Sequence, residues 1–266
     1  MTGGNSLIIV EKERIADIPV LHVAKQDIWK EVSPLVIFIH GFGSAKEHNL
    51  HYAYLLAEKG FRVILPDVAW HGEREEGLKE SQLLNHFWPI VVQTIDELAV
   101  IKDELLTRKL IDPTKIGVAG TSLGGIVTNG ALAVYDWIHA AVSLMGNPAY
   151  LDYAKLQLET IQKHNPNFTI SDEESERQMA LISKYDLSLQ PEKLAGRPLL
   201  FWHGAKDPIV PYTFAYKFYE SIRPAYEQNK LEFILDTRAD HKVSRYGLIQ
   251  TAEWFAKHLS RVGQNT

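Results

Sequence analysis

Short runs of uniformly apolar residues recur along the chain, and helix-compatible segments separate most of them. Runs of this length predict strands that are buried on both faces of a sheet. Two apolar runs near the start, Leu7–Val10 and Ile18–Val23, are separated by the charged stretch Glu11–Arg14 and predict two antiparallel strands at a sheet edge. The six buried-strand candidates are Leu35–Ile39, Phe61–Leu65, Lys115–Gly120, Ala140–Leu144, Pro198–Trp202 and Leu231–Leu235.

Apolar residues at helical spacing fill most of the intervals between these runs. The longest such region extends from about Ser81 to Leu110, where Pro89 is expected to start or kink the helix. A second helix is expected to open at Pro211. Six strands that alternate with helices predict an α/β fold with a doubly wound, mostly parallel sheet, which the two edge strands enlarge to eight strands. Ligands of such sheets bind beyond the C-terminal ends of the strands.

The segment from Tyr150 to about Leu194 interrupts this alternation. It is more polar than its surroundings and contains the turn signals Asn165–Asn167 and Gln190-Pro191. We interpret it as an insertion that folds over the top of the sheet. The prediction is therefore a single domain over residues 1–266, with a short helical cap at about 150–194.

Composition narrows the possible partners. Of the 266 residues, 45% are hydrophobic and 23% are charged, which is ordinary globular usage. The net charge is −5, and the sequence has no clustered basic stretch. We therefore expect no nucleic-acid partner. No apolar run approaches the roughly 18 residues of a membrane span, and the first residues do not resemble a signal peptide. We therefore expect no membrane partner and a cytoplasmic location, whereas the oligomeric state is left open.

A Gly-x-Ser-x-Gly pattern joins the strand candidate Lys115–Gly120 to the helix-compatible segment that follows it. Ser122 lies at a predicted strand-to-helix turn and is flanked by Gly120 and Gly124. Such a turn strains the serine backbone and requires neighbours without bulk, and it exposes the hydroxyl above the sheet. The N-terminus of the helix points its N–H groups to the place where negative charge would form.

A serine nucleophile requires a base, and the base requires an orienting acid. Asp207 follows the strand that ends at Trp202, and His241 follows the last strand, so the order along the chain is Ser, Asp, His. Asp236 and Asp240 are alternative acids. Asp240 ranks below Asp207 because adjacent side chains on a turn seldom face each other, and Asp236 is the stronger alternative because it ends the last strand.

The chain at this point resembles the α/β-hydrolase family, whose catalytic triad has this order. Three stretches match its motifs: Gly120–Gly124 matches the nucleophile elbow, His203–Pro211 the loop that carries the acid, and His40–Gly43 the oxyanion loop. Within that family the chain is similar to small prolyl-oligopeptidase-like or dienelactone-hydrolase-like bacterial carboxylesterases, which share a loop like Asp67–Arg74.

The resemblance implies the α/β-hydrolase fold and assigns roles to individual residues. Ser122 is expected to be the nucleophile, His241 the general base and acid, and Asp207 the group that orients the imidazole. The backbone N–H groups of Leu123 and Phe42 are the expected oxyanion donors. The candidates for a substrate pocket are His40, Trp70, His71, Met145 and Tyr150, and the insertion offers an apolar wall from Tyr150, Leu151, Tyr153 and Leu156. His40 is also expected to be a structural hydrogen-bonding residue rather than a second base.

Other chemistries are disfavoured. The chain has no cysteine, which excludes disulfides, thiolate metal sites and a cysteine nucleophile like that of dienelactone hydrolases. His48 and His51 could share a helical face, but no third ligand lies at metal-site spacing, so we expect no metal. Gly41 and Gly43 lack the third glycine of a dinucleotide motif, and no cofactor is expected.

The expected activity is therefore hydrolysis of small-molecule esters with short acyl chains through an acyl-serine intermediate. Two alternatives are a peptidase or amidase of the prolyl-oligopeptidase-like type and a ligand-binding receptor that keeps the fold with little turnover.

Overall fold

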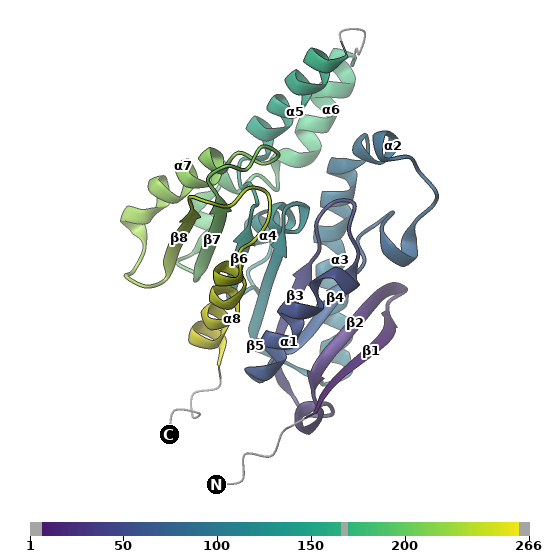
Figure 1. Cartoon of the computed structure of the whole chain (residues 1–266), viewed down its shortest axis with the longest axis vertical. Coiled ribbons are helices and arrows are strands. Elements are labelled where there is room, and N and C mark those ends of the chain that lie inside the picture. The colour runs from purple at the N-terminus through teal and green to yellow at the C-terminus, as the bar shows by residue number, and fades with distance from the viewer. Residues whose placement is uncertain (1–6, 166–169, 261–266) are drawn as a thin grey trace.

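The computed structural model describes residues 7–165 and 170–260, and these residues form one eight-stranded sheet in the order β1-β2-β4-β3-β5-β6-β7-β8 (Figure 1). β1 pairs with β2, and β2 with β4, in antiparallel fashion. The six strands β3 to β8 all run parallel to one another. The predicted doubly wound, mostly parallel sheet is confirmed. The strands are β1 (Ile8–Ile15), β2 (Ile18–Lys25), β3 (Ser33–Ile39), β4 (Arg62–Pro66), β5 (Ile111–Thr121), β6 (Ala140–Leu144), β7 (Leu199–Gly204) and β8 (Leu231–Asp236).

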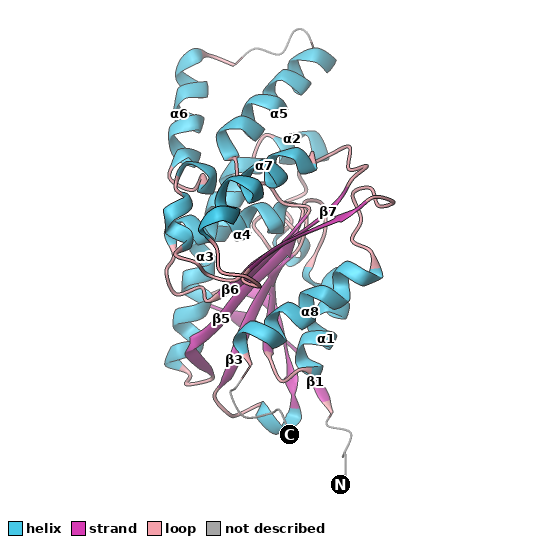
Figure 2. Cartoon of the chain, turned by 90° about the vertical axis from the view of Figure 1, so that its left-hand side faces the viewer, coloured by secondary structure: helices cyan, strands magenta, loops and turns pink. Residues whose placement is uncertain are grey.

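Helices cover both faces of the sheet. α1 (Leu50–Glu58) and α8 (Arg245–Leu259) pack on one face, where Tyr52 and Phe255 belong to the core. α3 (Phe87–Thr107), α4 (Leu123–Val134) and α7 (Tyr212–Ile222) pack on the other face, as Figure 2 shows. Because a parallel sheet is covered on both faces, its strands are continuously apolar, which explains why they could be recognised in the sequence.

The N-terminal hairpin differs from its prediction. The charged stretch Glu11–Arg14 does not separate two short strands but lies within β1, and the hairpin turns at Ala16 and Asp17, which both have positive φ (47° and 68°). Two residues of this kind form the turn whose twist matches paired strands. Charged residues are tolerated in β1 because it is an edge strand with one side open to solvent.

The predicted helix from Ser81 to Leu110 is divided into two. α2 (Glu80–Leu84) ends before His86, which is the N-cap of α3, and Pro89 lies in the first turn of α3. Proline is tolerated there because the first N–H groups of a helix have no intrahelical acceptor. The prediction that Pro89 starts a helix is therefore confirmed.

The segment between β6 and β7 contains two helices beyond the end of the sheet. α5 (Tyr150–His164) and α6 (Asp172–Ser183) run side by side and extend away from the sheet (Figures 1 and 2). Part of the turn signal at Asn165–Asn167 lies outside the described residues. The remaining short 3-10 segments are η1 (Gln26–Ile28), η2 (Lys46–Asn49), η3 (Gly72–Arg74), η4 (Leu187–Leu189), η5 (Pro191–Leu194) and η6 (Arg223–Ala225).

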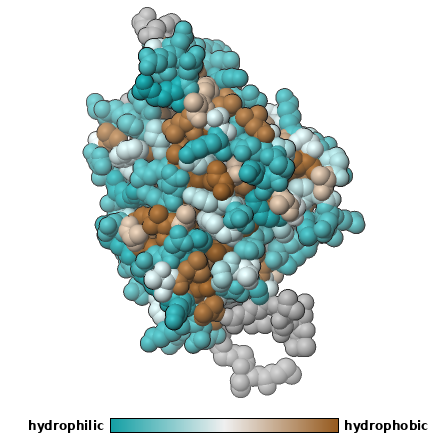
Figure 3. All heavy atoms as spheres, turned by 180° about the vertical axis from the view of Figure 1, so that it is seen from behind, coloured by the Kyte–Doolittle hydropathy of each residue, from teal (hydrophilic) through white to brown (hydrophobic). Residues whose placement is uncertain are grey.

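The surface mixes hydrophilic and hydrophobic residues. On the face seen in Figure 3, hydrophobic side chains form several separate patches among hydrophilic ones. Dispersed apolar residues are usual on protein surfaces. Within the described part of the chain, no helix combines the length and the apolar character that a membrane crossing requires.

A close crossing of backbones sets the position of the turn between β5 and α4. A methyl group built on Gly120 would lie 2.5 Å from the backbone carbon of Gly124, and one built on Gly124 would lie 2.1 Å from the carbonyl oxygen of Ile39. The first turn of α4 therefore rests directly on the ends of β5 and β3. Ser122, the single residue between strand and helix, is left with φ 54° and ψ −113°.

We predict that Gly124→Ala destabilises the fold by at least about 3 kcal/mol, because the obstructing atoms belong to backbone and not to flexible side chains. Urea denaturation measures this loss. Gly60→Ala is the matched control: its φ is 88°, but no atom lies within 4 Å of the added methyl group. It should cost only about 1–2 kcal/mol of backbone strain. Equal losses in the two variants would contradict the steric account.

Candidate active site

Three loops meet above the C-terminal ends of the parallel strands, and each contributes one polar side chain. Ser122 follows β5, Asp207 follows β7 and His241 follows β8. The Nε2 atom of His241 lies 2.8 Å from the Ser122 Oγ, and its Nδ1 atom lies 2.7 Å from the Asp207 Oδ2. Both are hydrogen-bond distances. The structure therefore brings the hydroxyl, imidazole and carboxylate together in series.

The Asp207 side chain is fully buried and rich in hydrogen bonds. Its Oδ1 atom accepts hydrogen bonds from the N–H groups of Ile209 (2.9 Å) and Val210 (3.0 Å). Burial alone would raise the pKa of Asp207, but the neighbouring His203, His241 and these two N–H groups hold it well below its usual range. The carboxylate therefore stays ionised and can stabilise an imidazolium at position 241.

The alternative acids have other environments. Asp236 accepts a hydrogen bond from the N–H of Arg238 (3.1 Å), and that interaction and one with Ser244 lower its pKa. Asp240 is exposed. The carboxylate that contacts the His241 ring is that of Asp207.

The buried His203 side chain contacts both Asp207 and the loop that carries it. Its Nε2 atom lies 2.8 Å from the carbonyl oxygen of Val210 and 3.4 Å from the Asp207 Oδ2. Both neighbours are acceptors, so Nε2 must carry the proton. The side chain thereby links the end of β7 to the loop that holds Asp207. The sequence motif alone predicts no separate role for His203.

Backbone N–H groups are available beside Ser122. Leu123 is the first residue of α4, so its N–H has no acceptor within the helix. The residues Gly41–Ser44 form a turn in which the Ser44 N–H donates to the Gly41 oxygen (3.2 Å) and Gly43 has φ 69°. A methyl group built on Gly41 would lie 3.5 Å from the Ser122 Cβ, so this turn lies directly against the serine.

Four of the five pocket candidates are buried in the structure, and three of these lie outside the loop after β4. His40 and Tyr150 are fully buried, and the Tyr150 hydroxyl donates to the carbonyl oxygen of Ile126 (2.5 Å). Met145 packs in the core on the face covered by α1 and α8. His40 and Met145 directly follow a strand, where the next loop can bury a residue, and Tyr150 begins α5. The sequence does not reveal which of these positions are buried.

The two other candidates lie in the loop after β4. Trp70 is partly exposed and has φ 59°. Its ring centroid lies 4.9 Å from that of His86. His71 is buried, and its ring packs edge-on at 5.2 Å against Phe42. Burial lowers the pKa of His71.

Aromatic rings connect the oxyanion loop to the acid loop. The distances between ring centroids are 5.9 Å for Phe42 and Phe87, 6.4 Å for Phe87 and Tyr153, and 6.3 Å for Tyr153 and Phe214. The Tyr153 hydroxyl donates to the carbonyl oxygen of Ile209, two residues after the acid (3.3 Å). Tyr153 was expected in an apolar wall. Phe87 and Phe214 were missed, although both lie near the start of a helix at the same sheet edge.

An ion cluster, in which Lys46 and Asp67 are buried and Glu73 is exposed, joins the segment after the oxyanion loop to the loop after β4. The Lys46 ammonium lies 2.6 Å from the Asp67 Oδ2 and 2.8 Å from Glu73, and the Lys46 N–H donates to the Asp67 Oδ1 (3.0 Å). Burial alone would lower the pKa of Lys46, but these acids raise it above its usual value. No local pattern in the sequence indicates this pair, because a lysine after a loop usually lies in solvent.

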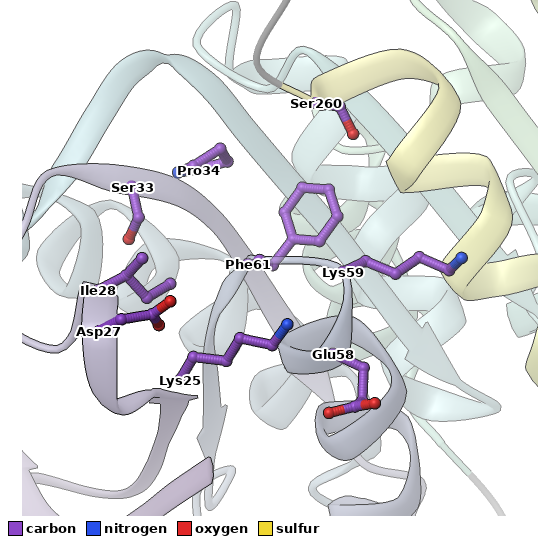
Figure 4. A pocket seen from close by; sticks show the side chains of 10 residues that line it. Lys25, Asp27, Ile28, Ser33, Pro34, Glu58, Lys59, Phe61 and Ser260 are labelled. Atoms are coloured by element: carbon purple, nitrogen blue, oxygen red, sulfur yellow. The ribbon is translucent and has the colours of Figure 1, made fainter. Parts of the chain in front are cut away.

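Other candidate sites lie elsewhere. A cavity of about 200 Å³ is lined by Lys25, Ser33, Lys59 and Phe61 (Figure 4). Ser33 begins β3, whereas His40 follows its end, so this cavity lies at the opposite end of the sheet from Ser122. Among residues 7–165 and 170–260, no group of three or more acidic or histidine side chains is placed to hold a metal ion.

The chain is similar to known proteins over almost its whole length. The model of the prolyl oligopeptidase family matches residues 47–261. The Bacillus subtilis (strain 168) protein named "Putative esterase YitV" is 50% identical over 255 residues, which cover 95% of this chain and 100% of that protein. "Esterase YjfP" of Escherichia coli (strain K12) is 27% identical over 253 residues, which cover 95% of this chain and 100% of that protein.

A solved structure shares the fold. The crystal structure of TT1662 from Thermus thermophilus superposes with a TM-score of 0.73 at 21% identity, covering 96% of this chain and 99% of that one. At this identity the likeness concerns the fold alone.

Burial of His40 predicts a pH dependence of stability. Burial lowers its pKa from 6.5 to about 4, against a smaller opposing effect of its hydrogen bond with Gly41. The unfolded chain therefore binds a proton on this residue at a higher pH than the folded chain. We expect the free energy of unfolding to fall by about 2 kcal/mol through His40 between pH 7 and pH 5.

Urea denaturation of wild type and His40→Asn at both pH values isolates this contribution, since the other titrating groups are the same in both. The wild type should lose about 2 kcal/mol more than the variant over this range. Asp207 and Asp67 have lowered pKa values in the folded chain, so their protonation reduces the free energy of unfolding mainly below pH 5. Parallel pH profiles for the two proteins would contradict the prediction.

Proposed function

The chain belongs to the prolyl oligopeptidase family, and on that premise we propose that it is a serine hydrolase that cleaves carboxylic esters with Ser122 as its nucleophile. The observation that carries the proposal is the pair of hydrogen bonds that joins Ser122, His241 and Asp207 in series. Two relatives that match over their whole length are named esterases, which favours ester substrates.

The geometry supports a two-step acyl transfer. The Ser122 Oγ attacks the ester carbonyl carbon while the His241 Nε2 takes its proton, and Asp207 stabilises the imidazolium that forms. The N–H groups of Phe42 and Leu123 bind the negative oxygen of the tetrahedral intermediate. The intermediate collapses, His241 passes the proton to the leaving alcohol, and a water molecule then hydrolyses the acyl-serine by the same route.

Short acyl groups suit this site best. The rings of Phe42, Phe87, Tyr153 and Phe214 form an aromatic wall between the oxyanion loop and the acid loop. Tyr153 belongs to α5, so we assign residues 150–194 as a cap within a single domain of residues 1–266. Because this wall extends from the oxyanion loop to the acid loop, we expect it to limit the length of the acyl chain. The cytoplasmic location stays a prediction of the sequence.

We expect wild type to hydrolyse p-nitrophenyl acetate and butyrate and a fluorophosphonate to label Ser122, as peptide mass spectrometry would show. Ser122→Ala should abolish both. Asp207→Asn should lower kcat about 10⁴-fold, because the imidazole would then adopt the wrong tautomer. Asp236→Asn is the matched control and should stay within about threefold of wild type, since Asp236 makes a turn hydrogen bond instead.

Several outcomes would overturn this assignment. A larger loss in Asp236→Asn than in Asp207→Asn would move the acid to the end of β8. A preference for p-nitroanilides of amino acids over esters would favour the peptidase. Labelling of Ser122 without turnover of any ester or amide would favour a receptor.

A further inference from the structure

His40 is the residue immediately before the oxyanion loop, and both of its ring nitrogens bind backbone. The Nδ1 atom lies 2.8 Å from the Gly41 carbonyl oxygen, and the Nε2 atom lies 3.1 Å from the Val68 nitrogen. A carbonyl oxygen only accepts and a backbone N–H only donates, so the proton must be on Nδ1 and the ring is neutral. The side chain has no exposed surface, so it contacts neither solvent nor a substrate directly.

The Gly41 oxygen belongs to the same peptide unit as the Phe42 N–H. In a trans peptide the C=O and the N–H point in opposite directions, so holding one fixes the direction of the other. The Gly41 oxygen accepts from the His40 Nδ1 and also from the Ser44 N–H (3.2 Å). Donors on the carbonyl also polarise the amide, which strengthens its N–H as a donor.

The other end of His40 is anchored in a rigid region. Val68 is fully buried and follows Asp67, which is held by Lys46. The imidazole therefore bridges two loops of fixed position, the one after β3 and the one after β4. No exposed or long side chain takes part in this bridge, so its geometry is set before any substrate arrives.

We propose that His40 is a positioning residue that orients the Gly41–Phe42 peptide so that the Phe42 N–H faces the oxyanion. The inference rests on the proposed function, because it concerns the oxyanion of the Ser122 reaction. It assigns the role to one hydrogen bond, the one from Nδ1 to the Gly41 oxygen. The bond from the Val68 N–H to Nε2 serves to hold the ring.

Two amide variants separate these bonds. In His40→Asn the side-chain NH₂ lies near the position of Nδ1 and can still donate to Gly41. In His40→Gln the amide lies near the position of Nε2 and can accept from Val68, but it leaves the Gly41 oxygen without its side-chain donor. We expect H40Q to lower kcat on p-nitrophenyl acetate about 10–100-fold with KM changed less than twofold, because the loss arises in the transition state. H40N should stay within about threefold of wild type.

A merely structural role would affect both variants alike and would follow their melting temperatures. A loss in H40N as large as that in H40Q, in folded proteins, would overturn the proposal. Because H40N is tested separately, a large loss of activity in folded H40N would overturn the proposal even if H40Q does not fold.

A second measurement observes the amide itself. In protein labelled with ¹⁵N-phenylalanine, the Phe42 signal is identified by its loss in Phe42→Tyr. Phenylboronic acid, which forms a tetrahedral adduct with an active-site serine, should move this signal downfield in wild type and H40N, and less than half as far in H40Q. An equal shift in H40Q would refute the role of His40. If the adduct forms but the wild-type signal does not move, the Phe42 donor of the proposed function is wrong, and the role of His40 fails with it.

Discussion

The crossing of α4 over the ends of β5 and β3 is the constraint on which the site depends. The backbones of Gly120, Gly124 and Ile39 approach so closely that no side chain fits between them. The chain can make this turn only if one residue adopts a strained backbone conformation, and that residue is Ser122, with φ 54°. The strain is compensated by the packing on either side, where the strand is buried over residues 116–120 and the helix over residues 123–133.

The same sheet edge is held rigid by buried polar groups that belong to different loops. The acid loop closes on itself through the N–H groups of Ile209 and Val210, which bind Asp207. The oxyanion loop is fixed through His40 and through the pair of Lys46 and Asp67. A buried charge or imidazole without partners would be unfavourable, so these contacts specify a single arrangement of the loops. Preorganised donors of this kind need no rearrangement when charge develops during a reaction.

The proposed preference for short acyl groups depends on a different part of the chain. Tyr153 comes from the segment between β6 and β7, and its ring lies between Phe87 of α3 and Phe214 of α7. The wall is therefore assembled from three elements that are distant in sequence. In the proposed function, the residues that carry out the chemistry therefore lie at the ends of the strands, whereas the residues that select the acyl group lie on the surrounding helices.

The sequence by itself determined most of the elements and the order of the candidate catalytic side chains. Buried parallel strands are uniformly apolar, and an elbow needs small residues around its serine, so both are visible in local patterns. It could rank Asp207 above Asp236 but could not show which carboxylate contacts His241. It also could not show that Glu11–Arg14 continues an edge strand, that Tyr150 is in the core, or that Lys46 is buried beside Asp67. These features depend on which loops pack against one another above the sheet, and such contacts join residues whose separation along the chain carries no local signal.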